Sequence, residues 1–407
     1  MNKMKKIYLL ICSLLFVMIL ACSSKSEDEE GTAKMAAPDF TAQNSYMDRL
    51  VLNWETLSGA TEYEVRYSDA ENMTDAELIK TGKTFVDIEN LEKGSSYFFQ
   101  VRAQLKSGWT DWSAINQINT ASFEASITTY NVLGVEADPN VEPEYAWHLR
   151  KEALKAMILQ ANNNPDIIAF QETTTVAPEI KEMIGENYDS HISEREVSAR
   201  LISWKPGKFE LVSYNDDIDI FGSEVTGRNT ARYIAHVRLR EIETGKEILV
   251  YNVHVPASTN LPKKDGQRIR QIGARNLAEY VKQEVKESGL PAVVLGDLNN
   301  YFDTVVEGIK SAPKVLSENG FADTFQEAPT RTNEDYSTTV NRATSSVKPG
   351  ENGSRRLDYI FVYPGEQVSI GDYSIIINFS EGSSTRLQEP VPSDHHPVKS
   401  VLYFSYD

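Results

Sequence analysis

The feature that most restricts the fold of this chain is a change in its hydrophobic pattern near residue 122. Residues 36–121 contain short segments in which apolar and polar residues alternate, separated by turn-rich stretches. The clearest of these segments are Leu50–Trp54, Tyr63–Tyr67 and Tyr97–Ala103. Such alternation is typical of half-buried strands, so this part of the chain is predicted to be an all-β sandwich.

Residues 123–405 follow a different pattern, in which apolar strands alternate with helical segments. Apolar residues recur at helical spacing from Trp147 to Asn162 and again from Ile269 to Val285. Each helical segment leads into a strongly apolar strand, at 166–170 and at 292–295. This order of elements predicts a second domain of the α/β (α+β) class.

Composition limits the class of protein. The 407 residues are 41% hydrophobic and 10% aromatic, which supports real cores and excludes a disordered or fibrous chain. The formal net charge is −18. Because non-specific binding of polyanions depends on lysine and arginine, this charge argues against a protein whose main function is to bind polyanions. A locally basic site remains compatible with it.

Residues 1–21 have the pattern of a bacterial lipoprotein signal peptide. Three lysines precede an apolar run that is too short to span a bilayer comfortably and that ends at Ile19-Leu20-Ala21-Cys22. This ending resembles a lipobox, which implies that Cys22 carries a lipid. The alternative is an ordinary signal peptide followed by an incidental cysteine.

Residues 22–35 form an acidic tether, which resembles an export signal to the cell surface or serves as a plain spacer. We therefore expect a protein anchored in the bacterial cell envelope, at the outer membrane, with surface exposure left open. The chain has 2 cysteines, Cys12 and Cys22. The mature domains would then contain no thiol, so their chemistry depends on oxygen and nitrogen groups.

Several separate apolar strands of the second domain end or begin in polar residues. Each polar residue taken singly has an ordinary structural explanation, such as a strand edge, a turn or a surface pair. The set as a whole is less easily explained in that way. Its members are Asn131, Glu172, His254, Asp297, Asn299, Asp358, Asp394 and His395.

The ordered set resembles the motifs of the endonuclease/exonuclease/phosphatase superfamily. The matching segments are Thr129–Leu133, Trp147 with Arg150, Pro165–Glu172, Asn252–His254, Gly296–Asn299, Arg356–Phe361 and Ser393–His395. The resemblance covers residues 123–405. It implies a DNase I-like four-layer αββα sandwich with an active site at one end.

The N-terminal segment 36–121 resembles a fibronectin type III module. Trp54 lies on an early strand, Tyr63 opens the next, Leu91 precedes Tyr97, and Ser107–Ser113 leads into the last strand. These aromatic residues are most simply core residues. A carbohydrate or protein contact through this module is the functional alternative.

The polar set suits phosphoester hydrolysis. A divalent cation, Mg²⁺ or in its place Mn²⁺, would neutralise charge on the phosphoryl oxygens and prefers oxygen ligands. Glu172 is the first candidate ligand, with Asn131 and Asp394 beside it. Asp297, positioned by Asn299, is a candidate base for the attacking water.

The histidines allow more than one assignment. His395 is the rival base to Asp297, and Asp358 would orient His395 and favour its protonated form. His254 would donate to the leaving oxygen or bind the phosphate. These three assignments stay open at the level of the sequence.

Arginines near the motifs are candidates for binding the substrate phosphate. They are Arg232, Arg356 and Arg270, of which Arg270 has a structural anchor as its alternative role. The substrate expected from the sequence is nucleic acid. The alternatives are a phospholipid, as in sphingomyelinases, a small phosphoester, or no substrate at all in a binding lipoprotein. The cysteine count excludes a disulfide-bonded DNase I.

Overall fold

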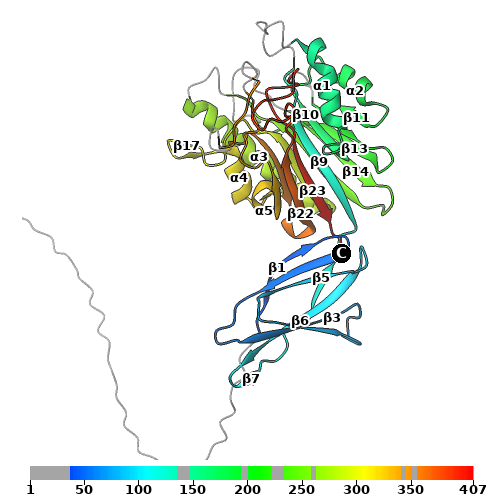
Figure 1. The fold of residues 1–407 in the computed structure, drawn as a ribbon, viewed down its shortest axis with the longest axis vertical. Coiled ribbons are helices and arrows are strands. Elements are labelled where there is room, and N and C mark those ends of the chain that lie inside the picture. The colour runs from blue at the N-terminus through cyan, green and yellow to red at the C-terminus, as the bar shows by residue number, and fades with distance from the viewer. Residues whose placement is uncertain are drawn as a thin grey trace, which may run out of the picture.

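The computed structural model describes residues 37–134, 146–193, 200–221, 233–257, 263–340, 345–350 and 355–406. It has an N-terminal β-sandwich and a larger C-terminal domain in which two central sheets carry helices on their outer faces (Figure 1). Both expected fold types are therefore confirmed. The predicted signal peptide and Cys22 lie outside the described residues.

The N-terminal module packs two sheets around one core. One sheet has the strand order β1-β2-β5, and the other contains β4-β3-β6-β7 with β8 paired to β6. Their bounds are β1 Phe40–Ser45, β2 Arg49–Trp54, β3 Glu62–Ser68, β4 Glu77–Thr81, β5 Phe85–Glu89, β6 Ser96–Leu105, β7 Gly108–Trp109 and β8 Asn116–Asn119. Trp54, Tyr63 and Phe99 are buried between the sheets, as the alternating pattern predicts.

The larger domain contains a 7-stranded sheet of order β11-β12-β10-β9-β23-β22-β20 and a 6-stranded sheet of order β13-β14-β15-β16-β21-β19. The first sheet consists of β9 Phe123–Asn131, β10 Ile167–Gln171, β11 Asp189–Ile192, β12 Leu201–Trp204, β20 Thr330–Thr332, β22 Val368–Ile375 and β23 Val398–Phe404. The second consists of β13 Phe209–Asp219, β14 Tyr233–Glu241, β15 Glu247–His254, β16 Ala292–Asp297, β19 Ala322–Asp323 and β21 Asp358–Tyr363. The short hairpin β17 Val305–Val306 and β18 Ile309–Lys310 lies apart.

Four of the described helices, α1 to α4, cover the outer faces of the sheets, and α5 packs against the core between them. The elements are α1 Trp147–Leu159, α2 Ala177–Ile184, α3 Lys263–Ser288, α4 Ala312–Glu318, α5 Thr324–Glu327 and the 3₁₀ turn η6 Gly365–Gln367. Helices α1 and α2 pack on the 7-stranded sheet, and α3 and α4 pack on the 6-stranded sheet. A third core fills the space between the sheets. The central strands are buried on both faces and thus read as continuous apolar runs.

The two expected helices differ from the observed ones at their ends. Helix α1 stops at Leu159, earlier than Asn162, because the Asn-Pro that follows favours a turn. Helix α3 begins at Lys263, before Ile269, with a polar first turn that carries no apolar signal. Among the described residues, no helix is long and apolar enough to cross a bilayer.

The module is joined to the larger domain by direct contacts. Ser122 N donates to Phe404 O at 2.7 Å, and Asn119 Nδ2 donates to Tyr406 O at 3.0 Å. Ser45 N donates to Ser369 Oγ at 2.7 Å across the junction. The C-terminal strand therefore ends at the junction, as Figure 1 shows.

Candidate active site

Strand pairing brings the polar strand ends together. Strands β9 and β10 are parallel with Asn131 opposite Gln171, so Asn131 and Glu172 lie side by side. In the other sheet, His254 is opposite Asp297, and Asp297 is opposite Asp358. Each strand places its polar residue at the same edge of the double sheet. The predicted set therefore converges at the end of the sandwich that is remote from the N-terminal module.

Asn131 links the two sheets at this edge. Its Nδ2 lies 3.1 Å from Glu172 Oε1 and 3.1 Å from Asp297 Oδ2. The amide thus holds two carboxylates that would otherwise repel each other. Asp297 is buried, whereas the Glu172 side chain is 24% exposed.

The backbone at the site adopts conformations that are uncommon for residues with side chains. Glu172 has φ 58° and Asn299 has φ 45°. Gly134 lies against Glu172, since a Cβ on Gly134 would be 2.1 Å from the Glu172 carbonyl oxygen. Left-handed residues of this kind persist where the surrounding structure fixes them, and they occur often at functional sites.

His254 lies within reach of three site residues. Its Nε2 is 3.2 Å from Asn299 Nδ2, 3.7 Å from Asp297 Oδ2 and 3.8 Å from Glu172 Oε1. The Asn299 backbone N–H also donates to Asp297 Oδ1 at 2.7 Å. Asn299 therefore positions both Asp297 and His254, as its place two residues after Asp297 suggests.

His395 and Asp358 form a buried pair. His395 Nδ1 lies 2.8 Å from Asp358 Oδ2, while His395 Nε2 points toward Asp297 Oδ2 at 3.9 Å. Burial alone lowers the pKa of His395, but the Asp358 carboxylate outweighs burial and holds this pKa well above its usual range. His395 is therefore an imidazolium at neutral pH, with Nε2–H directed into the site.

The shift of the Asp297 pKa favours the uncharged form of this carboxyl. Burial raises the pKa of the Asp297 carboxyl to about 7, against the lowering effect of the His395 charge. A carboxyl with a pKa near neutrality accepts a proton more readily than an ordinary aspartate. The geometry thus offers a base, Asp297, within 3.9 Å of an acid, His395.

Asp394 lies on the loop that carries His395. It is partly buried, and its Oδ1 is 3.4 Å from Ser393 Oγ. Its charge contributes to the raised pKa of His395. Asp394 thus lies close enough to influence the charge of His395, and its expected role as a metal ligand stays a prediction.

Two of the three expected phosphate-binding arginines are used inside the protein. Arg356 Nη1 and Nη2 bind Asp323 Oδ1 and Oδ2 at 3.0 and 2.8 Å. Arg270 is buried and donates to Pro256 O at 3.3 Å and to Gln267 Oε1 at 3.2 Å. Arg356 is therefore a structural anchor, which contradicts its expected role in phosphate binding. The hydrogen bonds of Arg270 fit its alternative role as an anchor. The third, Arg232, lies outside the described residues.

Several residues that support the site were not assigned from the sequence. Gln171 Nε2 donates to Asn252 Oδ1 at 2.8 Å and Asn252 Nδ2 donates to Phe170 O at 2.8 Å, which ties the two sheets together just below the site. Arg150 Nη1 donates to Val132 O and to Pro392 O at 2.6 and 2.7 Å. A polar residue inside an otherwise apolar run, such as Asn252, was the signal available for them.

The donor set suits a hard divalent cation. Glu172 and Asp297 supply carboxylate oxygens around one amide, and such oxygen-rich sites favour Mg²⁺ or Mn²⁺. Asp297, Asp358 and His395 also bring donor atoms within 4.8 Å of one another. Because His395 already bonds Asp358 at 2.8 Å, that trio is better described as a hydrogen-bonded pair facing Asp297. Glu172 is the residue best placed to hold a cation.

Asn131 was expected to be a cation ligand as well. Its amide N–H groups face the two carboxylates, and its Oδ1 accepts a hydrogen bond from Leu133 N at 3.0 Å. In this arrangement Asn131 positions Glu172 and directs no oxygen toward the space beside it.

Comparison with known proteins agrees with both parts of the fold. The model of the endonuclease/exonuclease/phosphatase family matches residues 128–395, and that of the fibronectin type III domain matches residues 36–119. No curated protein matches the chain.

Solved structures resemble the larger domain. A family protein from Bacteroides thetaiotaomicron is 20% identical with a TM-score of 0.55, covering 70% of this chain and 99% of that one. A mannosyl-6-phosphatase from Bacteroides thetaiotaomicron VPI-5482 is 21% identical with a TM-score of 0.54, covering 69% and 99%. At these identities the likeness shows the fold. Because the family model matches the greater part of the chain, this protein belongs to the endonuclease/exonuclease/phosphatase family and is a metal-dependent phosphoester hydrolase.

Proposed function

We propose that this protein is a Mg²⁺-dependent hydrolase of a compact, soluble phosphoester and that it acts at the bacterial cell envelope. The observation that carries the proposal is the convergence of Glu172, His254, Asp297 and the His395–Asp358 pair at one end of the double sheet. Acid, base and cation ligand lie within one small space there. Inactive scaffolds have no need to maintain this combination.

Glu172 is the residue that would hold Mg²⁺, with Mn²⁺ as a substitute. When bound, the cation would neutralise negative charge on the phosphoryl oxygens. Asn131 fixes the Glu172 carboxylate for this task through the 3.1 Å hydrogen bond. The left-handed backbone at Glu172, allowed by Gly134, sets the direction of the side chain.

The remaining residues move protons. Asp297 takes the proton of the attacking water as the water oxygen bonds to phosphorus, and the bond from phosphorus to the leaving oxygen breaks. The raised pKa of Asp297 suits this step. His395, protonated because of Asp358, stabilises the phosphoryl oxygens through Nε2–H. His254, held by Asn299, would when protonated give its proton to the leaving oxygen.

The substrate ranking rests on the arginines. Since Arg356 and Arg270 are bound within the protein, they are not available to a long polyanion, and the net charge is −18. This favours a compact phosphoester, such as a phosphorylated sugar, and the mannosyl-6-phosphatase among the similar structures is consistent with that class. Nucleic acid, the substrate expected from the sequence, is the second candidate, because Arg268 and Arg355 are exposed on segments that flank the site.

The position of the site argues against lipids of the protein's own membrane. Strand β9 runs from Phe123 at the junction to Asn131 at the site, and its 9 residues span about 30 Å. The N-terminal module extends further in the opposite direction (Figure 1). If Cys22 carries the proposed anchor, the N-terminal module lies between the anchor and the catalytic domain along the chain, which favours a substrate other than that membrane. Replacing Cys22 by Ser should release the protein from the membrane fraction, and a variant that stays bound would refute the anchor.

A substrate panel tests the proposal. The protein is incubated with mannose 6-phosphate, bis(p-nitrophenyl) phosphate, plasmid DNA, RNA and sphingomyelin vesicles, with Mg²⁺ or with a chelator. We expect Mg²⁺-dependent release of phosphate from the sugar phosphate, lost in Glu172→Gln and retained in the matched control Asp189→Asn on the remote edge strand β11. Preferred cleavage of DNA or RNA would reverse the ranking. A folded protein with no activity on any substrate would leave the binding lipoprotein as the better explanation.

A further inference from the structure

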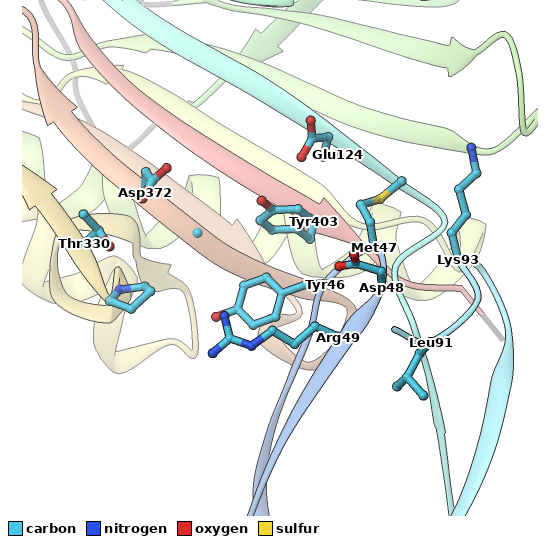
Figure 2. Close-up of a pocket in the computed structure, with 12 residues that line it drawn as sticks. Tyr46, Met47, Asp48, Arg49, Leu91, Lys93, Glu124, Thr330, Asp372 and Tyr403 are labelled. Atoms are coloured by element: carbon cyan, nitrogen blue, oxygen red, sulfur yellow. The ribbon is translucent and has the colours of Figure 1, made fainter. Parts of the chain in front are cut away.

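A cleft lies between the fibronectin type III module and the catalytic domain, on one side of their junction (Figure 2). Its volume is about 480 Å³, which is within the range of small-ligand pockets, and such pockets often form between domains. The module contributes residues 46–49, 91 and 93, and the catalytic domain contributes residues 124, 329, 330, 371, 372 and 403. The cleft is at the opposite end of β9 from the active site, so hydrolysis does not account for it.

A bulge in β22 shapes the catalytic wall of the cleft. The pairing of β22 with β23 shifts register between Ile370 and Tyr373, and bulges turn side chains into new directions. Gly371 allows the Tyr403 ring to lie over this bulge, because a Cβ there would be 2.7 Å from the ring. The next residue, Asp372, is exposed and lines the cleft. The bulge thus sets a flat ring and a carboxylate side by side.

The module supplies a second aromatic ring. Tyr46 meets Tyr403 edge to face, with ring centroids 5.0 Å apart and an interplanar angle of 80°. Both rings are partly exposed and stand in the middle of the cleft, with Asp372 and Thr330 on one side and Asp48 on the other (Figure 2). Tyrosine rings of this kind offer an apolar face together with a polar tip.

The cations that line the cleft are already paired. Arg49 binds Asp87 with two hydrogen bonds of 2.6 Å each, and Lys93 forms an ion pair with Glu243. Their charges are therefore compensated from outside the cleft. An anionic ligand, including a phosphoester, would find no uncompensated cation on these walls within the described part of the chain.

Acceptor groups remain on the cleft walls. The side chains of Asp48 and Asp372 make no hydrogen bond or ion pair to another described residue. Glu124, which neighbours Tyr403 across the strand pair, is exposed as well. Carboxylates accept hydrogen bonds from hydroxyl groups, and the charge-assisted bonds that result are strong.

We propose that this cleft binds a neutral carbohydrate. The cleft offers aromatic rings that can pack against sugar C–H groups and carboxylates that can accept hydrogen bonds from hydroxyls. Because its cations are already compensated, these groups fit a polyol better than an anion. A cationic ligand fits less well, because the Arg49 guanidinium already lies 5.2 Å from the centre of the Tyr46 ring and takes the place of a cation there. The module would then supply half of a sugar site in addition to joining the domains.

Isothermal titration calorimetry on the complete mature chain tests this site. The probes are maltotriose, mannotriose and cellotriose at millimolar concentrations, with inorganic phosphate and spermidine as the anionic and cationic comparisons. Asp372→Ala removes an exposed acceptor and leaves the cores intact, and Tyr46→Leu removes a ring. Asp189→Asn is the matched surface control. Hydrolytic activity serves as the test of folding, since none of these residues lies in the catalytic site.

We expect at least one trisaccharide to bind, and each cleft variant to weaken that binding by about tenfold, the effect of losing one or two good contacts. The control and the activity should stay unchanged. The proposal is wrong if no trisaccharide binds the wild type, if only spermidine or phosphate binds, or if the cleft variants bind the sugar as the wild type does. Binding is measured without turnover, so these results leave the proposed hydrolase function untouched.

Discussion

The ion pair between Arg356 and Asp323 allows the sharpest test of the site assignment. The sequence suggests that Arg356, two residues before Asp358, binds substrate phosphate. In the structure its guanidinium points away from the site and binds Asp323 at 3.0 and 2.8 Å. Replacing Arg356 by Ala should therefore destabilise the domain and leave the chemistry of the folded protein unchanged.

The magnitude follows from burial. The Arg356 and Asp323 side chains are 6% and 0% exposed, so little solvent screens the pair. Removing one partner of a buried pair leaves an uncompensated charge and costs about 3–5 kcal/mol. For a domain of this size each kcal/mol lowers Tm by about 2–4 °C, which gives a decrease of about 6–20 °C. The guanidinium also lies 4.0 Å from the Phe325 ring centre, and that contact is lost too.

Thermal unfolding and steady-state kinetics provide the assay. Arg355→Ala is the matched control, because Arg355 is the exposed neighbour of Arg356 and lies 5.0 Å from the Tyr301 ring centre. It should change Tm little. The double variant Arg356→Met with Asp323→Asn should regain much of the lost stability. It removes both charges, and Asn retains the oxygen that accepts from Phe325 N at the start of α5.

The kinetic result decides between the two roles. Below its Tm, Arg356→Ala should keep the kcat and KM of the wild type. A large rise in KM with an unchanged Tm would refute the structural role and restore the phosphate-binding one.

Four further results are expected. The kcat/KM should rise with pH through about 7 as the Asp297 carboxyl ionises, and a profile that is flat between pH 5 and 8 would contradict Asp297 as the base. Asp358→Asn should lower kcat by about 10²–10⁴-fold. It should also move the alkaline limb of the pH profile to lower pH, because the carboxylate that most strongly opposes the effect of burial on the pKa of His395 is then lost, leaving the weaker effects of Asp297 and Asp394; an unmoved limb would show that His395 does not titrate in catalysis. Glu172→Gln should weaken Mg²⁺ binding measured by calorimetry by at least about 100-fold, more than the usual effect of a residue that only supports a ligand, while Gly134→Ala should lower Tm because its Cβ would meet the Glu172 carbonyl oxygen at 2.1 Å.

Much of the fold follows from local pattern. Alternation in segments such as Leu50–Trp54 requires a half-buried sheet, and apolar runs such as 292–295 require strands covered on both faces. Because several strands of the larger domain end or begin in a polar group, the sequence also picks out the candidate site residues His254, Asp297 and Asp358. These residues lie directly opposite one another on neighbouring strands, so the strand pairing brings them together.

The roles of individual side chains depended on the tertiary structure. Arg355 and Arg356 are neighbours of the same type, and only the position of Asp323 determines which of them is buried. Asn131 is another example: its residue type and position suggest a cation ligand, but its amide N–H groups contact two carboxylates.

The sequence by itself determined two domains of known type, the class of chemistry and most of the residues that converge on the site, because hydrophobic periodicity and strand-end polarity are local properties of the chain. Tertiary structure decided which charges are paired, that burial raises the pKa of Asp297 while Asp358 raises that of His395, and that the two domains enclose a cleft at Tyr46 and Tyr403. Those outcomes depend on burial and on partners far away in the sequence, such as residues 46 and 403, and no local pattern contains that information.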